Sequence, residues 1–411
     1  MRIAIFTETY LPQLNGVVTH IKILKEGLEA LGHTVLIVTA DSSTHKHYLE
    51  NDVLHCPAHN LKRIYGLDLA SPVSRTRLHY LREFNPDIIH VHNEFSIGFS
   101  GMAIAKILHI PMVYTLHTMY DDYIYYVAPK PLVPLTKKIS HRYFRMFAQN
   151  ANVVTGPSQK CQEYTKEIGS NKKVEVIPNP VELDQFAPET STQEQRDAIR
   201  KKCNIPLDAT VACFVGRLGR EKSVDVLLNY WAKEITKQDN MYLMIVGDGP
   251  EKPVLEDLAQ KLGITDTVVF TGKVMHTDLP PYIHTCDIYV TASLSDTNSI
   301  SMLEGMAGGL PVLQLYDELN ADQVRDGVNG YMFKDAKEMA ERLRLIRDMD
   351  KEDLQVLKAS VIQSVKHSGA ENLANYIQTI YFGIYKNNPP KKKGYAKHLS
   401  LHPVLKKGKE K

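Results

Sequence analysis

Short apolar runs rich in β-branched residues alternate with helical patterns along the first half of the chain. The runs predict six strands, at residues 2–6, 34–39, 87–91, 112–116, 152–155 and 174–177. Strands that alternate with helices form a parallel sheet covered by those helices. The first half therefore predicts an α/β unit of Rossmann type.

The same alternation starts again after a polar stretch at residues 188–195. Five further runs predict strands at 210–215, 242–246, 267–270, 287–291 and 311–315. A chain of 411 residues also exceeds the size at which one core keeps growing. We predict two Rossmann-like domains, 1–187 and 188–368, with a site between them because ligands bind at the carboxyl ends of such strands.

The end of the chain divides into a helix and a basic tail. Residues 369–386 predict a helix with an apolar stripe, which we expect to pack back on the N-terminal domain. From Lys386 to the end the chain carries nine lysines and a single acid, Glu410. The tail, 387–411, could be a solubilising end, bind nucleic acid without specificity, or contact an anionic surface; no motif that reads DNA or RNA accompanies it.

Composition places the chain among globular proteins of a reducing compartment. Hydrophobic residues make up 43% and charged residues 23%, and the five cysteines show no metal or redox spacing. The first residues read as a strand and lack a signal-peptide pattern. Because no run approaches 18 apolar residues, we expect a cytoplasmic protein whose membrane contact is peripheral.

Three strand–loop–helix segments carry candidate chemistry. In the first, residues 6–19, Gly16 would open a helix and let backbone N–H groups approach an anion. In the second, residues 215–223, Arg217 and Lys222 bracket a loop and could clamp a pyrophosphate. The alternatives are a plain turn for Gly16 and a solvated loop for the two basic residues.

The third segment, residues 291–307, contains two acids separated by seven residues. Asp296 would lie in the loop and Glu304 inside the following helix, where they could hold sugar and ribose hydroxyls. Alternatively, Asp296 caps the helix and Glu304 is a surface acid.

Polar residues also follow four other predicted strands, at 90–94, 114–118, 177–180 and 247–250. His90, His92 and Glu94 alternate on one side of their segment, which resembles a metal site. No third cluster of ligands supports it, so we predict no metal.

These segments, in this order, resemble the family 4 glycosyltransferases of GT-B fold over the whole chain before the tail. The matching pieces are Gly216 to Lys222, Gly247 to Pro250 and the acid pair Asp296 and Glu304. The resemblance implies that Arg217 and Lys222 bind the donor's pyrophosphate and that Glu304 binds its ribose. It further implies that Asp296 and His117 hold the transferred sugar, and that Gly16 and Gly247 line the donor site.

Within the family, residues 11–19 and 114–123 are most similar to bacterial diacylglycerol α-glucosyltransferases. The resemblance implies UDP-glucose as donor, a diacylglycerol-type lipid as acceptor, retention of anomeric configuration and no catalytic metal. Positive groups would stabilise the charge that grows on the leaving diphosphate. Two features depart from the family pattern: Asp296 replaces the usual glutamate, and Ser299-Ile300 replaces a Gly-Leu pair.

A membrane acceptor is also supported by residues 129–148. Apolar residues recur there at helical spacing, and the other face carries Lys137, Lys138, Arg142 and Arg145. A basic amphipathic helix can lie in the interface of an anionic bilayer, here on the inner face of the cell membrane. Alternatively, the same apolar stripe packs on its own domain.

Two further interpretations remain. The acceptor could be a soluble glycan or another cell-envelope precursor, or the chain could be a non-catalytic scaffold, given the departures at Asp296 and Ser299. The sequence leaves the oligomeric state open.

Overall fold

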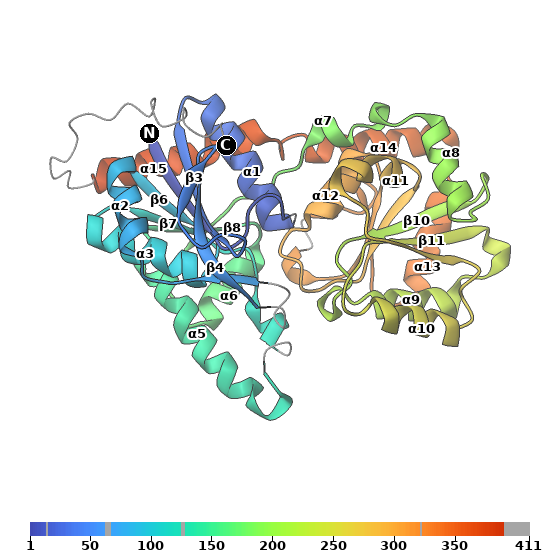
Figure 1. The fold of residues 1–411 in the computed structure, drawn as a ribbon. Helices are drawn as coiled ribbons and strands as arrows, with labels where there is room; N and C mark the ends of the chain where they lie inside the picture. The colour runs from blue at the N-terminus through green and yellow to red at the C-terminus, as the bar shows by residue number, and fades with distance from the viewer. Residues whose placement is uncertain (14, 62–66, 125–127, 321–322, 390–411) are drawn as a thin grey trace, which may run out of the picture.

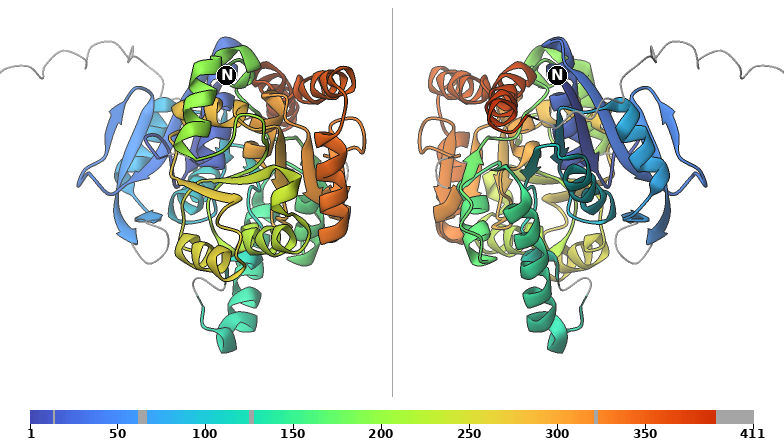
Figure 2. Two further views of the ribbon diagram at one scale, coloured as in Figure 1. Left: turned by 90° about the vertical axis from the view of Figure 1, so that its right-hand side faces the viewer. Right: turned by 90° about the vertical axis from the view of Figure 1, so that its left-hand side faces the viewer.

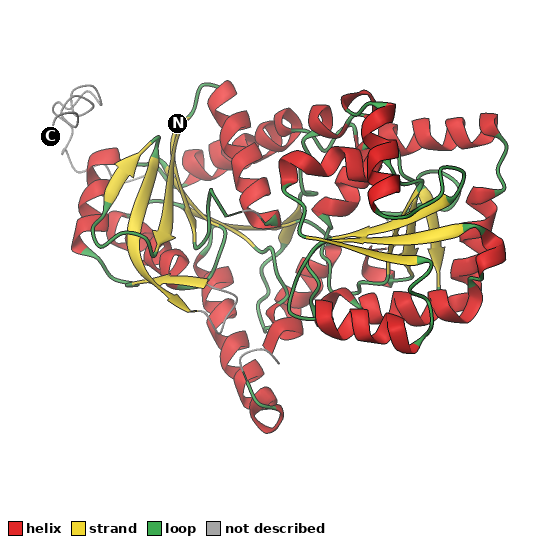
Figure 3. Cartoon of the chain, turned by 45° about the vertical axis from the view of Figure 1, so that its right-hand side comes forward, coloured by secondary structure: helices red, strands yellow, loops and turns green. Residues whose placement is uncertain are grey.

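The protein consists of two α/β units that lie side by side (Figure 1). The computed structural model describes residues 1–13, 15–61, 67–124, 128–320 and 323–389. Each unit has a twisted sheet with helices on both faces, so the predicted fold class is confirmed (Figure 3).

The first sheet has nine strands in the order β3-β4-β2-β1-β6-β7-β8-β9, with β5 paired to β4. All neighbours are parallel except β3 and β5, which run antiparallel to β4. The strands are β1 (Arg2–Thr7), β2 (Thr34–Asp41), β3 (Tyr48–Glu50), β4 (Val53–Leu61), β5 (Leu67–Ala70), β6 (Ile88–Val91), β7 (Met112–Thr115), β8 (Val153–Gly156) and β9 (Val174–Val176). Its helices are α1 (Gly16–Ala30), α2 (Arg75–Phe84), α3 (Ser96–Leu108), α5 (Val133–Asn150) and α6 (Gln159–Glu167).

The second sheet has six parallel strands in the order β12-β11-β10-β13-β14-β15. The strands are β10 (Thr210–Val215), β11 (Met241–Val246), β12 (Val268–Gly272), β13 (Ile288–Thr291), β14 (Val312–Leu315) and β15 (Gly330–Phe333). The helices are α7 (Leu183–Phe186), α8 (Gln193–Lys202), α9 (Val224–Glu234), α10 (Lys252–Lys261), α11 (Leu279–His284), α12 (Ile300–Ala307), α13 (Ala336–Arg347) and α14 (Lys351–Val365).

The last helix, α15 (Ala370–Asn387), leaves the second unit and packs on the first (Figure 1). Its apolar side chains share a core with β1 and α1. The two helices approach so closely that a Cβ atom on Gly27 would lie 2.7 Å from the Cβ of Ala374. The predicted basic tail lies outside the described residues from position 390 on.

Helix α5 extends from the first unit well beyond its sheet (Figures 1 and 2). Only the end of this helix is buried, at Phe144, Phe147 and Ala148. Among the described helices, none is both long and apolar enough to cross a membrane.

Candidate active site

The two units meet where strands of both sheets end and helices begin. Helix α1 starts at Gly16, and the side chain of Asn15 accepts a hydrogen bond from the Val18 amide at 3.0 Å. A Cβ atom on Gly16 would lie 3.6 Å from Cδ1 of Ile300, the first residue of α12. Two helix N-termini thus lie together at the boundary, and their exposed N–H groups favour an anion there.

Gly216 and Gly247 shape the loop that carries Arg217. Their φ angles are +155° and +144°, and a Cβ atom on Gly247 would lie 1.9 Å from the carbonyl oxygen of Gly216. Glycine is therefore required at position 247 for the two loops to pass each other. The Leu218 amide donates to the Asp248 carbonyl at 3.0 Å, which fixes the loop beside Arg217.

Lys222 and Asp296 form an ion pair in this region. Lys222 Nζ lies 2.5 Å from Asp296 Oδ1. Burial raises the pKa of Asp296, but the Lys222 ammonium more than offsets it, so the pKa ends below its usual value. Burial lowers the pKa of Lys222, and the Asp296 carboxylate raises it to above its usual range. Both groups are therefore charged at neutral pH.

Tyr123, from the first unit, lies close enough to this pair for the two charges to affect its pKa. Burial raises the pKa of Tyr123 to about 12, and Lys222 acts against that rise. The tyrosine follows the segment 114–118, but its position beside Lys222 depends on how the units meet. Sequence reasoning therefore did not single it out.

The alternative readings of the acid pair are both wrong. Ser299, not Asp296, caps α12, with its Oγ accepting from the Met302 amide at 3.4 Å. Glu304 is buried rather than on the surface, and its Oε1 lies 2.8 Å from His276 Nε2. Burial raises the pKa of Glu304, and the hydrogen bond to Glu304 raises the pKa of His276. His276 is a site residue that sequence reasoning missed.

His117 belongs to a cluster of imidazoles in the first unit. Its Nε2 lies 2.8 Å from His92 Nδ1, and its carbonyl accepts a hydrogen bond from Thr297 Oγ1 at 3.2 Å. The second contact brings His117 next to the loop of Asp296. His20 packs against both rings and bonds Asn179 Oδ1 at 3.0 Å.

The imidazoles of this cluster are neutral. Burial lowers the pKa of His20 to about 4, and burial together with neighbouring imidazoles lowers the pKa of His92 and of His117 well below the usual value. A neutral His117 can exchange hydrogen bonds with a sugar without bringing a charge into the site.

Among the residues that the structure describes, two groups of side chains have metal-ligating atoms within 4.8 Å of one another. One is His20, His92 and His117, and the other is Asp121, His141 and Glu167. The contact between His92 and His117 is a hydrogen-bond distance, shorter than the ~3.3 Å between two nitrogens on one tetrahedral zinc. The absence of a metal stays a prediction.

Further contacts join the units beside Asp296. Lys160 Nζ, from α6, donates to the carbonyls of Leu294 at 2.5 Å and Asp296 at 3.1 Å and pairs with Asp317. The Asn179 amide donates to Asn298 Oδ1 at 2.8 Å. These residues hold the loop of Asp296 against the first unit. Their partners lie more than 110 positions away, so no local pattern indicates the role of Lys160.

Comparison with known proteins decides the family. Residues 14–185 match the model of Glycosyltransferase Family 4, and residues 195–360 match that of Glycosyl transferases group 1. Alpha-monoglucosyldiacylglycerol synthase of Acholeplasma laidlawii is 33% identical, over 95% of this chain and 99% of that protein. The chain belongs to the family 4 glycosyltransferases.

Further relatives of this family 4 glycosyltransferase support the same family and fold. The alpha-monoglucosyldiacylglycerol synthase of Streptococcus pneumoniae is 29% identical, over 94% of this chain and 87% of its own. Anabaena HepE in complex with UDP-glucose superposes with a TM-score of 0.71 at 18% identity, covering 93% of this chain and all of HepE. Sucrose-phosphate synthase from Thermosynechococcus elongatus has the same TM-score and identity, over 94% and 99% of the two chains. These structural likenesses establish the GT-B fold.

Proposed function

We propose that this glycosyltransferase transfers glucose from UDP-glucose to a diacylglycerol-type lipid at the inner face of the cell membrane, with retention of configuration and without a bound metal. The two synthases of similar sequence are named for glucosyl transfer to diacylglycerol, and they span almost the whole chain. HepE, which shares the fold, binds UDP-glucose.

The observation that carries the lipid acceptor is the exposed apolar surface at the start of α5 and in the turn just before it. Leu132, Leu135 and Ile139 are 49%, 57% and 62% exposed, although each is large and apolar. Lys138 and Arg142 are exposed one turn away from them. Apolar and basic side chains that share one exposed surface suit the interface of an anionic bilayer, where each basic residue adds about 1 kcal/mol.

The other two basic residues of the predicted membrane surface face the protein. Lys137 pairs with Asp121 and Glu167, both at 2.8 Å, so its charge is balanced. Arg145 is half-buried beside Gly169. The membrane surface that we propose therefore consists of Leu132, Leu135, Lys138, Ile139 and Arg142.

The donor part of the proposal rests on the charges at the boundary between the units. As the bond from the anomeric carbon to the diphosphate breaks, negative charge grows on the diphosphate. Arg217, Lys222 and the N-terminus of α12 would stabilise that charge, and His117 with Asp296 would orient the sugar. The acceptor hydroxyl would attack from the same face, and its proton would pass to the leaving diphosphate.

The test offers UDP-glucose, UDP-galactose and GDP-mannose with diacylglycerol in anionic vesicles. We expect α-glucosyl-diacylglycerol from UDP-glucose, identified by mass spectrometry and NMR of the anomeric proton, with the same rate in EDTA. Transfer to soluble glycans but not to lipid would show that the acceptor is a soluble glycan and would contradict the proposed lipid acceptor. If no sugar nucleotide is hydrolysed or transferred, and Glu304→Ala leaves UDP affinity unchanged, the chain is a non-catalytic scaffold.

The membrane part has its own test. Leu135→Ser with Ile139→Ser should strongly reduce sedimentation with anionic vesicles and leave hydrolysis of UDP-glucose in solution unchanged. Val356→Ser, at a 70% exposed position on α14 of the second unit, is the matched control. Equal sedimentation of the α5 variant and the control would refute the proposed surface.

A further inference from the structure

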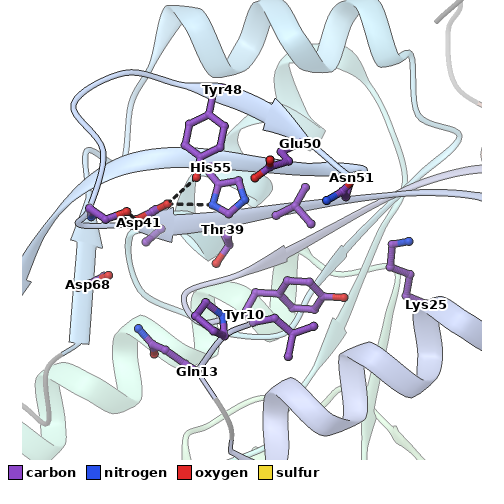
Figure 4. Close-up of a pocket in the computed structure, with 15 residues that line it drawn as sticks. Tyr10, Gln13, Lys25, Thr39, Asp41, Tyr48, Glu50, Asn51, His55 and Asp68 are labelled. Atoms are coloured by element: carbon purple, nitrogen blue, oxygen red, sulfur yellow. Dashed lines mark hydrogen bonds and ion pairs between the residues drawn. The ribbon is translucent and has the colours of Figure 1, made fainter. Parts of the chain in front are cut away.

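A cavity of about 510 Å³ lies in the first unit, apart from the residues described above. Its lining comes from the loop after β1, the carboxyl end of β2 and the strands β3 and β4 (Figure 4). The volume is in the range of small-molecule sites. The cavity shares no lining residue with the Lys222 and Asp296 region.

Polar side chains of this cavity are held in place before any ligand binds. Asp41 Oδ1 accepts from the Ser43 amide at 2.8 Å, and Oδ2 accepts from Tyr48 at 3.1 Å and lies 3.0 Å from His55 Nδ1. The rings of Tyr48 and His55 stack at 4.4 Å with an interplanar angle of 2°. Because Asp41 engages Nδ1, the Nε2 atom of His55 remains for a ligand (Figure 4). Such a fixed set of groups is typical of a built binding site.

Thr39 supplies an independent observation. Its side chain is 2% exposed, and Oγ1 has no hydrogen-bond partner among the described residues. Thr39 pairs in register with His55, and its hydroxyl is directed toward the cavity (Figure 4). A buried hydroxyl without a partner costs folding free energy, and a hydroxyl of a bound ligand would satisfy it.

The charges of the lining restrict the ligand. Asp41, Glu50 and Asp68 contribute three carboxylates, whereas Lys25 is the only lysine or arginine among the lining residues and pairs with Glu29 at 2.6 Å. A phosphate or another anion would be repelled. The hydroxyl, carboxylate and imidazole groups, together with the ring of Tyr10, suit a neutral molecule with many hydroxyls.

The cavity adjoins the candidate active site through one loop. Tyr10 and Gln13 form part of its wall, and the chain continues from this loop into α1 at Gly16, whose Cβ position lies 3.6 Å from Cδ1 of Ile300. A molecule bound in the cavity would therefore lie on the first unit, beside the loop that leads into the N-terminus of α1.

We propose that this cavity binds a neutral hexose ring of the acceptor, so that the enzyme also glucosylates a lipid that already carries a sugar. This inference rests on the proposed function. In the transfer, a hydroxyl oxygen of the bound hexose forms a bond to the anomeric carbon of the donor. The bond from that carbon to the diphosphate breaks, and the hydroxyl proton passes to the leaving diphosphate.

The test compares Thr39→Val with the wild type on vesicles that contain diacylglycerol or α-glucosyl-diacylglycerol. Loss of one hydrogen bond should raise KM for the glucosylated lipid about tenfold. KM for UDP-glucose and turnover on diacylglycerol should not change. The melting temperature should not fall, because the hydroxyl that is removed has no partner in the protein. Asp41→Asn, which weakens the support of His55, should also raise KM for the glucosylated lipid.

Thr34→Val makes the same change at the exposed opposite end of β2 and should have no effect. Turnover on diacylglycerol without use of the glucosylated lipid, or an unchanged KM in both variants, would overturn this inference and leave the proposed function intact. If no lipid is glucosylated, the proposed function fails. The cavity is then tested separately, by measuring the binding of α-glucosylglycerol with saturation-transfer NMR. If the wild type does not bind α-glucosylglycerol, or if Thr39→Val binds it equally well, the proposed hexose site is refuted.

Discussion

In the structure, the carboxylate of Asp296 neutralises the charge of Lys222. A bound diphosphate would therefore either contact Lys222 together with that carboxylate or displace it. In the proposed reaction the positive charge of Lys222 would contribute most as the diphosphate leaves, because the transition state would carry more negative charge there than the donor does. Lys222→Met should lower kcat by about 10²–10³-fold, the effect typical of losing one such donor. Steady-state kinetics with UDP-glucose measure it.

Arg220 provides a control in the same loop. It is 66% exposed on its side chain and pairs with Glu251 at 3.1 Å. Arg220→Met should leave kcat within about twofold, since exposed ion pairs contribute little. Equal losses in both variants would mean that the loop, and not the charge of Lys222, matters.

Glu94 is a buried carboxyl group whose protonation should affect stability. Its oxygens accept hydrogen bonds from Tyr114, at 2.5 Å, and from Tyr120. Burial raises its pKa from 4.5 to about 7. A carboxyl group with a raised pKa binds its proton more tightly in the folded state, so stability falls as pH rises from about 4.5 to 7 and is then level. The loss is about 3 kcal/mol.

Glu94→Gln replaces the carboxyl group with a permanently neutral one. The variant should lose most of this pH dependence and should gain stability relative to the wild type between pH 5 and pH 8. Urea unfolding across that range measures it. Glu341→Gln, at an exposed position on α13, should keep the wild-type profile. A wild-type profile that is already flat would contradict the prediction.

At the scale of elements, α6 contacts the second unit through the side chain of Lys160. Lys160 is 2% exposed and reaches the carbonyls of Leu294 and Asp296. It thereby positions the loop that carries Asp296 whenever the units are together. Lys160→Met should lower kcat about tenfold, leave the affinity for UDP nearly unchanged, and increase the radius of gyration of the donor-bound enzyme.

Lys166→Met, on the same helix, is the matched control. That side chain is 60% exposed and pairs with Glu163. It should alter neither kcat nor the radius of gyration, which scattering measures. If Lys160→Met instead weakens UDP binding and leaves the radius unchanged, Lys160 does not hold the units together.

Helix α5 shows what periodicity can and cannot predict. The apolar spacing from Leu132 to Phe147 correctly predicts a helix, but it does not indicate which part of the stripe packs on the domain and which part is exposed. In the structure, Phe147 is buried and Leu132 is exposed, because the sheet of the first unit supports only the last part of the helix. Which part of such a stripe is buried depends on where the domain ends, and local spacing carries no such information.

At the scale of the whole molecule, the sequence predicted the eleven strands with continuous apolar runs. It missed β3, β5 and β15, which are edge strands of three or four residues. It also missed β4, an inner strand of nine residues in which polar and apolar residues are mixed. Loop residues after buried strands, such as Arg217 and Asp296, were found because strand ends are recognisable. Lys160, His276 and Tyr123 were missed, since their roles arise only when distant segments meet.

The end of the chain combines a packed helix with a basic tail, and the two should respond differently to truncation. Leu373, Ile377, Tyr381 and Ile384 of α15 are buried in the core of the first unit. The burial of each of these side chains contributes about 1.5–3 kcal/mol. Together they contribute about as much as the whole free energy of unfolding of a typical domain. A chain that ends at Ser368 should therefore fail to fold its first unit and should aggregate.

A chain that ends at residue 389 keeps α15 and loses eight lysines. Its melting temperature and its hydrolysis of UDP-glucose in solution should match those of the full chain. Its affinity for anionic vesicles should fall, and the difference should shrink as salt rises from 0.05 to about 0.5 M, because salt screens the attraction. Vesicle sedimentation of both chains across that range measures the effect. An equal affinity at every salt concentration would assign membrane binding to the α5 surface alone.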